Sequence, residues 1–227
     1  MPLDTPGKKG KRGIRFQKKT RTSAGIALLI VGILLLASPW LTDLYTNWLQ
    51  GRLLQEYEGA FDELPGIDLL PAEGAPTGFD HVILKVPSIE LEAAVIAPPT
   101  TIEELDRLNR KGPVFFRSSA VPGARETVAI IAHRNVYGGH FKNIHHIAEG
   151  DRIYLDTPQR NYIYSFTESV IVDINDDDKM GEIFEVEPEN HRLLLTTCEH
   201  MGKNPHWDTP YRLIVAANLE EVEYKLE

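Results

Sequence analysis

The sequence predicts a mainly β protein, a closed eight-stranded β-barrel with one or two short helices, preceded by an N-terminal transmembrane helix. Two observations carry this prediction. Residues 22–42, TSAGIALLIVGILLLASPWLT, contain no charged side chain. From residue 81 onward, short apolar or alternating segments recur between turn residues, a pattern that is typical of strands in a barrel or sandwich. Closure into a barrel is favoured because it leaves no strand edge exposed.

The first 42 residues predict a single-pass membrane anchor. About 20 apolar residues cross a bilayer as a helix, and residues 22–42 meet that length. The preceding tail, residues 1–21, holds eight of the 24 Lys and Arg residues and one acidic residue, Asp4. A basic flank of this kind predicts a protein of the cell membrane whose N-terminus lies in the cytoplasm. The residues that follow the transmembrane helix would then lie on the extracytoplasmic side. A cleaved signal peptide is the alternative, but the apolar run is long for one and no clean small-x-small site follows it.

The charge balance excludes one class of partner. Residues 22–227 hold 16 basic and 32 acidic residues, a formal charge of −16. A region this acidic is unsuited to nucleic acid, whose phosphates need basic surface. Topology and anionic lipid headgroups account for the basic tail. We therefore expect the membrane as a partner, through residues 22–42, and no nucleic acid.

Residues 43–80 are expected to form a stalk helix and a linker. Apolar residues recur at threes and fours as far as Phe61, and Pro65-Gly66 ends the pattern. Packing on the outer domain, lying on the bilayer and self-association are the alternatives for this helix. Repeated Pro and Gly in residues 65–80 then predict a linker.

Residues 81–227 are expected to form one extracytoplasmic domain, long enough to bury a single core. A helix is predicted at residues 101–110, with Thr100 or Thr101 as its cap. The segments 127–133 and 192–198 are apolar enough for buried strands. The other strands are predicted at residues 81–87, 89–97, 151–157, 161–174 and 211–219.

Three side chains could support acyl transfer by a thiol. Cys198, the only cysteine, ends one buried strand, His133 ends the other, and Arg212 lies near the start of the last strand. Strand ends converge at the rim of a barrel, so these residues can meet there. A thiolate attacks a carbonyl, an imidazolium protonates the leaving amine, and a guanidinium stabilises the oxyanion or holds the substrate backbone. Each residue alone also fits a structural role, including a packed core thiol for Cys198.

The motifs, taken in this order, resemble those of the sortases, a family of membrane-anchored cysteine transpeptidases. LLLTTC followed by YRLIV, with AIIAHRNVYGGHF upstream, resembles the family's TLxTC strand, arginine strand and histidine turn. VPSIELEAAVI, GPVFFRSSAVPGARETVAIIAHR and FKNIHHIAEGDRIYLDT resemble the family's neighbouring segments. The resemblance covers about residues 81–219 and implies a sortase-type barrel. The chain departs from the family pattern at Ala132, where glycine is more usual.

The resemblance also implies roles for particular residues. Cys198 would be the nucleophile, His133 the general acid/base, and Arg212 the arginine that holds the oxyanion or the substrate. His200, two residues beyond the thiol, is the alternative acid/base. The turn HRNVYGGHF most resembles class E, a group that is linked to LAxTG-like sorting signals.

The implied reaction is cleavage of an LPxTG- or LAxTG-like sorting signal at its Thr–Gly bond, through a thioester on Cys198. Thr197 would contact the signal, and Tyr137 would bear on the preference for it. The substrates would be surface proteins with a C-terminal sorting signal, and the acyl acceptor would be an amine of a peptidoglycan precursor or a pilin lysine. Two other functions stay open: a catalytically inactive sortase-like module that binds surface proteins, and a hydrolase or thiol protease with water as acceptor.

No cofactor and no metal are expected. The predicted loop 174–190 contains the acidic run Asp176, Asp177 and Asp178. A calcium site is conceivable there because some members of the sortase family bind calcium. A solvated acidic loop is favoured instead, because adjacent carboxylates in one run cannot all face one ion. The histidines of the chain are not accompanied by a second cysteine or by an HExxH-type helix, which argues against a zinc site.

Overall fold

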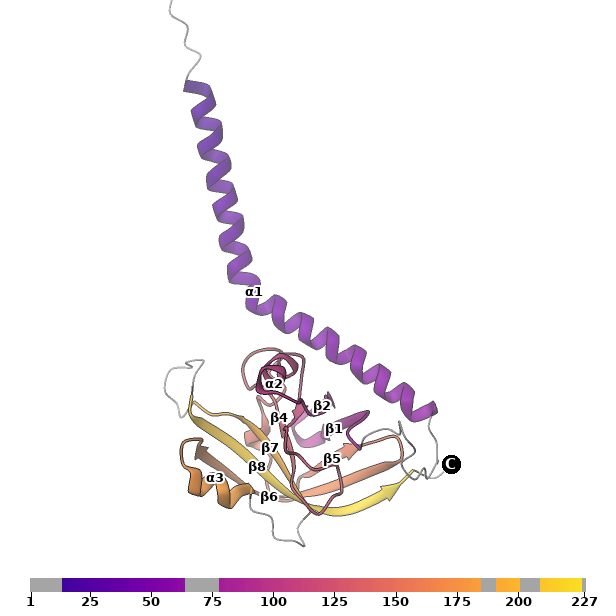
Figure 1. Ribbon diagram of the computed structural model, residues 1–227. Helices are drawn as coiled ribbons and strands as arrows, with labels where there is room; N and C mark the ends of the chain where they lie inside the picture. Colours follow the sequence, from indigo (N-terminus) through magenta and orange to yellow (C-terminus); the bar gives the residue numbers. More distant parts are fainter. Residues whose placement is uncertain (1–13, 64–77, 185–190, 201–208, 226–227) are drawn as a thin grey trace, which may run out of the picture. The chain divides into compact units, whose positions relative to one another are not determined.

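The structure is a computed structural model that describes residues 14–63, 78–184, 191–200 and 209–225 (Figure 1). Residue contacts divide the chain into two compact units, residues 1–41 and residues 42–227. The predictions for residues 1–13 and for most of the linker fall outside the described residues.

The charge-free run lies in one long helix, α1 (Ile14–Glu63), which contains Pro39. Apolar side chains of its first unit are exposed, and Leu36 is 84% exposed. Exposure of so many apolar side chains is unfavourable in water, and an apolar environment would accommodate them better. Within the described part of the chain, α1 is the one helix long and apolar enough to cross a membrane. The helix is therefore compatible with a single-pass membrane anchor.

The second unit contains the predicted β-barrel. Its strands are β1 (Val82–Val86), β2 (Leu91–Val95), β3 (Val114–Phe115), β4 (Val128–Ile131), β5 (Arg152–Asp156), β6 (Arg160–Asp173), β7 (Arg192–Cys198) and β8 (Tyr211–Tyr224). They form one eight-stranded sheet in the order β2-β1-β5-β6-β8-β7-β4-β3. Neighbours are antiparallel except β4 and β7, which are parallel. Ile96, just after β2, bridges to Val114 of β3 and closes the sheet, which confirms the predicted fold class.

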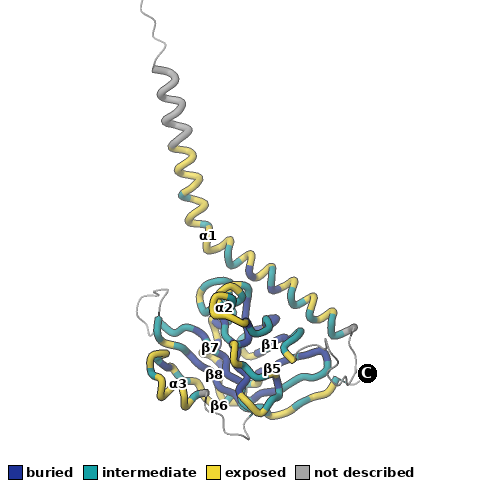
Figure 2. Tube along the Cα trace, viewed as in Figure 1, coloured by how far each residue is buried: buried dark blue, intermediate teal, exposed yellow. Residues whose placement is uncertain are grey.

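The buried residues concentrate in the barrel strands (Figure 2). Alternate side chains of a strand point to opposite faces of the sheet, so one strand can contribute to two clusters. Leu193 and Leu195 of β7 belong to the large inner core, and Leu194 belongs to a second cluster on the other face. We call this second group the outer cluster; its buried members are Ala129, Val172, Leu194, Ile214 and Ala216. Because β7 is covered on both faces, its leucines read as one continuous apolar run.

Two short helices flank the barrel. In α2 (Ile102–Asn109), Thr101 is the N-cap, because its side chain accepts a hydrogen bond from the Glu104 amide. The second helix, α3 (Asp177–Phe184), lies where the sequence predicted only a loop. The Asp176 carboxylate accepts a hydrogen bond from the Lys179 amide, and Met180 and Ile183 of α3 pack against the outer cluster. A cap and an apolar stripe at i, i+3 therefore form a helix here despite its adjacent aspartates.

From Thr42 onward, α1 belongs to the same compact unit as the barrel. The Tyr57 ring meets the His81 ring edge-on, with 5.0 Å between centroids, and the Lys225 amine lies 3.9 Å from the centre of the Phe61 ring. Of the three alternatives for this helical segment, the structure shows packing on the barrel.

Candidate active site

Cys198 and Arg212 face each other across two central strands. They are register partners at the end of β7 and the start of β8. The next pair outward is hydrogen-bonded, because the Glu199 amide donates to the Tyr211 carbonyl over 2.9 Å. Since the two kinds of pair alternate in an antiparallel ladder, Cys198 and Arg212 form a non-hydrogen-bonded pair, in which side chains lie closest. Cys198 is half-buried and shares its sheet face with Leu194 and the rest of the outer cluster.

His133 follows the parallel neighbour of β7. In the β4–β7 register, Ile131 lies opposite Thr196, so two further steps bring His133 level with Cys198. The Ala132 amide donates to the Thr196 carbonyl over 3.2 Å, which keeps the pairing beyond the end of β4. Ala132 is buried in the inner core, and alternation therefore turns His133 to the face that carries Cys198. The structure thus brings the three predicted residues to one end of three adjacent strands.

A charged bridge ties the histidine turn to the cysteine strand. The Arg134 guanidinium donates to the Cys198 carbonyl over 3.3 Å and forms an ion pair with the Glu199 carboxylate. Arg134 follows His133 directly, and Glu199 follows Cys198 directly. Both side chains are about 85% covered, with exposed fractions of 15% and 16%. A partly buried, hydrogen-bonded pair of this kind restrains the backbone on both of its sides.

The surroundings of His133 favour its neutral form. Burial lowers the pKa of His133; the Asp106 carboxylate opposes this shift, and the Arg110 guanidinium reinforces it. Burial, and then the charge of His133, lowers the pKa of His140 to about 4. Among the described residues, the buried Nε2 atom of His133 has no hydrogen-bond partner. A neutral imidazole with an open ring nitrogen is able to take a proton from a donor placed beside it.

The two residues expected to contact substrate occupy different surroundings. Tyr137 has a left-handed backbone with φ of 50°, and its ring centroid lies 5.1 Å from that of His133. Thr197 is 2% exposed, and its hydroxyl donates to the Ala132 carbonyl over 2.8 Å. That hydroxyl thereby joins β7 to the segment that leads into His133. The substrate roles of Tyr137 and Thr197 stay predictions.

Arg212 and His200 complete the neighbourhood of the thiol. The Arg212 Nη1 donates to the carbonyls of Thr209 and Tyr211, over 2.6 and 3.0 Å, so the guanidinium is held at the start of β8. The His200 amide donates to the Glu199 carboxylate. Among the described residues, the buried His200 Nδ1 has no partner. His200 therefore stays the alternative to His133 as the acid/base.

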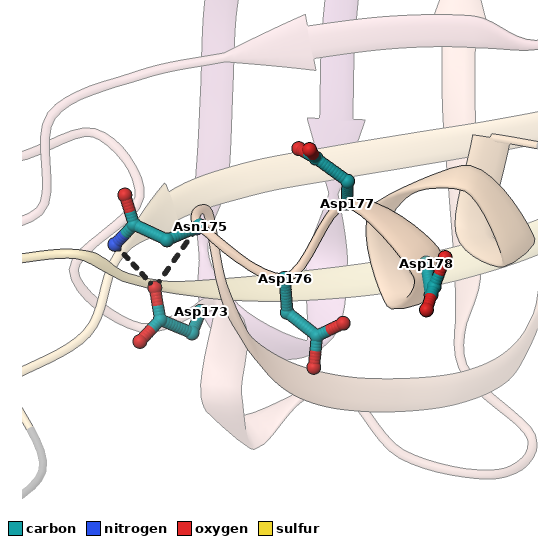
Figure 3. Close-up of a pocket in the computed structure, with 5 residues that line it drawn as sticks. All are labelled: Asp173, Asn175, Asp176, Asp177 and Asp178. Carbon is teal, nitrogen blue, oxygen red and sulfur yellow. Dashed lines mark hydrogen bonds between the residues drawn. The ribbon is translucent and has the colours of Figure 1, made fainter.

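The acidic run does not assemble a metal site in the described residues. Figure 3 shows the carboxylates of Asp176, Asp177 and Asp178 pointing in different directions. Asp173 accepts hydrogen bonds from the Asn175 amide and side chain. In the described part of the chain no three His, Cys, Asp or Glu side chains are grouped as metal ligands. The expected lack of a cofactor stays a prediction.

The sequence reasoning missed Arg134 and Glu199. Each is the residue directly after a motif residue, and a charged residue at a strand end is usually a solvated one. The signal that could have identified them is their opposite charge combined with a parallel pairing of the two strands. That pairing joins segments more than 60 residues apart in the sequence and has no local signature.

Three comparisons bear on the identity of the fold. A family model described as the sortase domain matches residues 84–220. A search of curated protein sequences found no match. Among solved structures, sortase E from Streptomyces avermitilis is 24% identical, with a TM-score of 0.50 over 63% of this chain and 89% of that one.

Two further structures come from Clostridium perfringens. The sortase D5 transpeptidase is 18% identical, with a TM-score of 0.55 over 76% of this chain and 99% of that one. A sortase C solved with a C-terminal cell wall sorting motif is 18% identical, with a TM-score of 0.51 over 79% of this chain and 91% of that one. At these identities the structures support the fold. The family match covers more than half of the chain, so the protein belongs to the sortase family of cysteine transpeptidases.

Proposed function

We propose that the chain is an active, membrane-anchored transpeptidase that cleaves a sorting signal at a Thr–Gly bond and transfers the acyl part to an amine. The observation that carries this function is the cross-strand pair of Cys198 and Arg212, with His133 at the end of the adjacent parallel strand. A nucleophile, a proton carrier and a fixed cation on one sheet face are the groups that acyl transfer by a thiol requires.

The first half-reaction forms a thioester. His133 takes the thiol proton of Cys198, and the sulfur attacks the carbonyl carbon of the scissile peptide bond. The Arg212 guanidinium donates hydrogen bonds to the negative charge that develops on the carbonyl oxygen or to the adjacent substrate backbone. The C–N bond then breaks, and the imidazolium gives its proton to the departing glycine amine.

The second half-reaction runs the same bond changes in the opposite direction, with a new amine in place of the glycine amine. A neutral acceptor amine attacks the thioester carbonyl, the C–S bond breaks, and the sulfur leaves as a thiolate. The proton of the attacking amine passes to His133 and then returns to Cys198. A new amide and the free enzyme result, so no oxidant, reductant or nucleotide is needed.

The anchor supports the same function. With the N-terminus in the cytoplasm and the barrel outside, residues 22–42 confine the enzyme to the plane that holds membrane-tethered substrates, which raises their effective concentration. The substrates are surface proteins with a C-terminal LPxTG- or LAxTG-like signal, as the likeness to class E suggests. The acceptor is an amine of a peptidoglycan precursor or of a pilin lysine. Thr197 and Tyr137 bear on recognition of the signal.

A peptide assay tests this function. The full-length protein in detergent micelles is mixed with LPxTG- and LAxTG-type peptides, with and without triglycine, and mass spectrometry follows acyl-enzyme and ligated peptide. Both species are expected with the native chain and neither with Cys198→Ala. His133→Ala is expected to lower the rate about 100- to 10,000-fold. Retained activity in His133→Ala together with loss in His200→Ala would assign the acid/base role to His200.

The same assay separates the two other functions. An inactive binding module would bind the peptides without forming a thioester. A hydrolase would cleave them yet yield no ligated product at high triglycine concentration. Either result would overturn the proposed transpeptidase activity.

A further inference from the structure

Residues 43–50 of α1 turn a polar face to the barrel, whereas further along the helix the apolar Tyr57 and Phe61 contact it. Thr46 and Gln50 are 1% and 4% exposed, although both are polar. Leu44, Tyr45 and Trp48 are 67%, 58% and 55% exposed. Asp43, Thr46 and Gln50 lie at i, i+3 and i+7, so they share one helix face, and that face is turned to the barrel. Buried polar side chains occur where partners satisfy them, and each of these has one.

The polar face of α1 bonds to three separate parts of the barrel domain. The Gln50 side chain donates to the Lys111 carbonyl and accepts from the Ala94 amide, each over 3.1 Å. The Thr46 hydroxyl lies 3.4 Å from the Arg110 carbonyl. These contacts fix the helix to β2 and to the end of α2. The third contact is made by Asp43.

Asp43 accepts a hydrogen bond from the Gly138 amide over 3.0 Å. Gly138 has φ of 81°, and a Cβ atom there would lie 2.9 Å from the Asn47 side-chain oxygen. A side chain at position 138 would be strained by this φ and would require the Asn47 side chain to move, so glycine suits the contact with the helix. This contact joins the membrane-proximal helix to the turn that follows His133.

Backbone hydrogen bonds close that turn, and one of them is accepted by His133. The Phe141 amide donates to the His133 carbonyl over 3.2 Å, and inside it the Gly139 amide donates to the Val136 carbonyl over 3.0 Å. Tyr137, the residue before Gly138, places its ring against the His133 ring. The guanidinium of Arg110, whose carbonyl faces Thr46, lies 5.5 Å from the centre of the Tyr137 ring. The backbone and the rings of the turn thus connect His133 to the helix.

We propose that residues 43–50 of the anchor helix form part of the active-site framework, with Asp43 as a positioning residue for the turn that carries His133. A stalk that only spans the distance to the membrane would need no buried polar face. By holding the Gly138 amide, Asp43 fixes the turn, and the turn fixes the ring of His133. The catalytic consequence of this role rests on the proposed function of His133, whereas the structural consequence does not.

The test compares three variants of the full-length chain in detergent micelles. Asp43→Ala removes the acceptor, Asp43→Asn keeps a side-chain oxygen at the same place, and Glu58→Ala removes a carboxylate from the exposed side of the same helix. Hydrogen exchange is followed by mass spectrometry on peptides that cover residues 134–141. The peptide assay gives kcat and KM for acyl-enzyme formation.

Asp43→Ala is expected to raise exchange at residues 134–141 at least tenfold while the barrel strands stay protected. It is expected to lower kcat at least tenfold with KM within twofold, whereas Asp43→Asn and Glu58→Ala match the native chain. Unchanged exchange in Asp43→Ala overturns the proposal, and so does raised exchange with native kcat. If the native chain shows no peptide activity, the proposed function fails by itself, and the exchange result alone decides the role of Asp43.

Discussion

Arg134 and Glu199 form an ion pair that joins the residue after His133 to the residue after Cys198. The pair crosses from the end of β4 to the end of β7, and Arg134 also donates to the Cys198 carbonyl. A positive and a negative charge are therefore held beside the thiol in a neutral combination. Removing Glu199 takes away a negative charge and removing Arg134 takes away a positive charge, so the two single variants have opposite electrostatic effects on Cys198.

We expect Cys198 to react faster with iodoacetamide at pH 7 in Glu199→Gln and more slowly in Arg134→Gln. Loss of the negative charge of Glu199 favours the thiolate, and loss of the positive charge of Arg134 disfavours it. A unit charge in a partly exposed site changes the rate roughly three- to tenfold. Iodoacetamide labelling of the full-length chain at pH 7, followed by mass over time, measures the rate.

Other charged and titratable groups near the thiol stay unchanged in both variants: Arg212 on β8, His133 in the turn after β4, and His200 beyond β7. The matched control is Glu168→Gln, which breaks a comparable ion pair with Arg192 at the opposite end of β7. It is expected to leave the alkylation rate of Cys198 unchanged. Rates that change in the same direction in both test variants would show that the pair does not act through its charges.

Acid is expected to destabilise the barrel through His140. Its pKa in the folded chain is about 4, below the value of about 6.5 in an unfolded chain. Above pH 6.5 both states are neutral. As the pH falls from 6.5 towards 4, the unfolded chain binds a proton that the folded chain refuses, so about 2–3 kcal/mol of the free energy of unfolding is lost.

His140→Phe tests this prediction, because phenylalanine keeps a flat ring and cannot be protonated. Urea unfolding at pH 7 and pH 4.5 is compared in the native chain and in the variant. We expect the acid-dependent loss to be about 2 kcal/mol smaller in His140→Phe. His145→Phe, at an exposed histidine, is expected to keep the native acid dependence. Equal losses in the native chain and in His140→Phe would contradict the prediction.

Arg212→Lys is expected to impair turnover without affecting thiol reactivity. Lysine keeps the positive charge near Cys198, but it lacks the planar set of donors by which a guanidinium can bond the Thr209 and Tyr211 carbonyls and also face a substrate. Loss of one oxyanion donor lowers kcat on the order of 100-fold. The peptide assay measures kcat/KM, and iodoacetamide labelling measures the thiol.

The control for Arg212→Lys is Arg152→Lys, at an arginine that pairs with Glu220 on the surface. It is expected to be as active as the native chain. If Arg212→Lys keeps full turnover, the charge alone suffices at this position. If it loses alkylation to the same extent as turnover, Arg212 acts on the thiolate and not on the substrate.

Much of the barrel could be predicted because its strands have strong local patterns. The run LLLTTC reads as a strand buried on both faces, and α3 and the outer cluster supply the second cover. The two-residue strand β3 gives no such pattern, because two residues are too few to show a period. The helix α3 was missed because three adjacent aspartates suggest a solvated loop, whereas Met180 and Ile183 decide the structure.

The sequence does not predict the buried face of α1 or the ion pair between Arg134 and Glu199, and the reason differs between the two. In residues 43–50 of α1 the most buried side chains, those of Thr46 and Gln50, are polar, whereas the apolar Leu44, Tyr45 and Trp48 are exposed, so in this segment the usual rule gives the wrong face. The positions of Cys198, His133 and Arg212 at strand ends follow from local patterns. The pairing of Arg134 with Glu199 depends on which strands become neighbours, and that is a property of the whole fold.

Gln50 is expected to stabilise the fold through the two hydrogen bonds of its buried side chain to the barrel domain. Gln50→Leu removes its hydrogen bonds to the Ala94 amide and the Lys111 carbonyl. It leaves two backbone groups without their partner at a place where the replaced side chain is 4% exposed. The cost of leaving such groups unpaired is about 1–3 kcal/mol each, so a loss of roughly 2–6 kcal/mol in the free energy of unfolding follows.

Urea unfolding of the full-length chain in micelles measures that loss, and Gln55→Leu, at an exposed glutamine of the same helix, is the control. The control is expected to stay within about 0.5 kcal/mol of the native chain. Gln50→Glu keeps an acceptor for the Ala94 amide but turns a carboxylate towards the Lys111 carbonyl, so at pH 7 it should destabilise at least as much as leucine. Equal stability of the two leucine variants would show that hydrophobic contact, and not the paired polar face, holds α1 on the barrel.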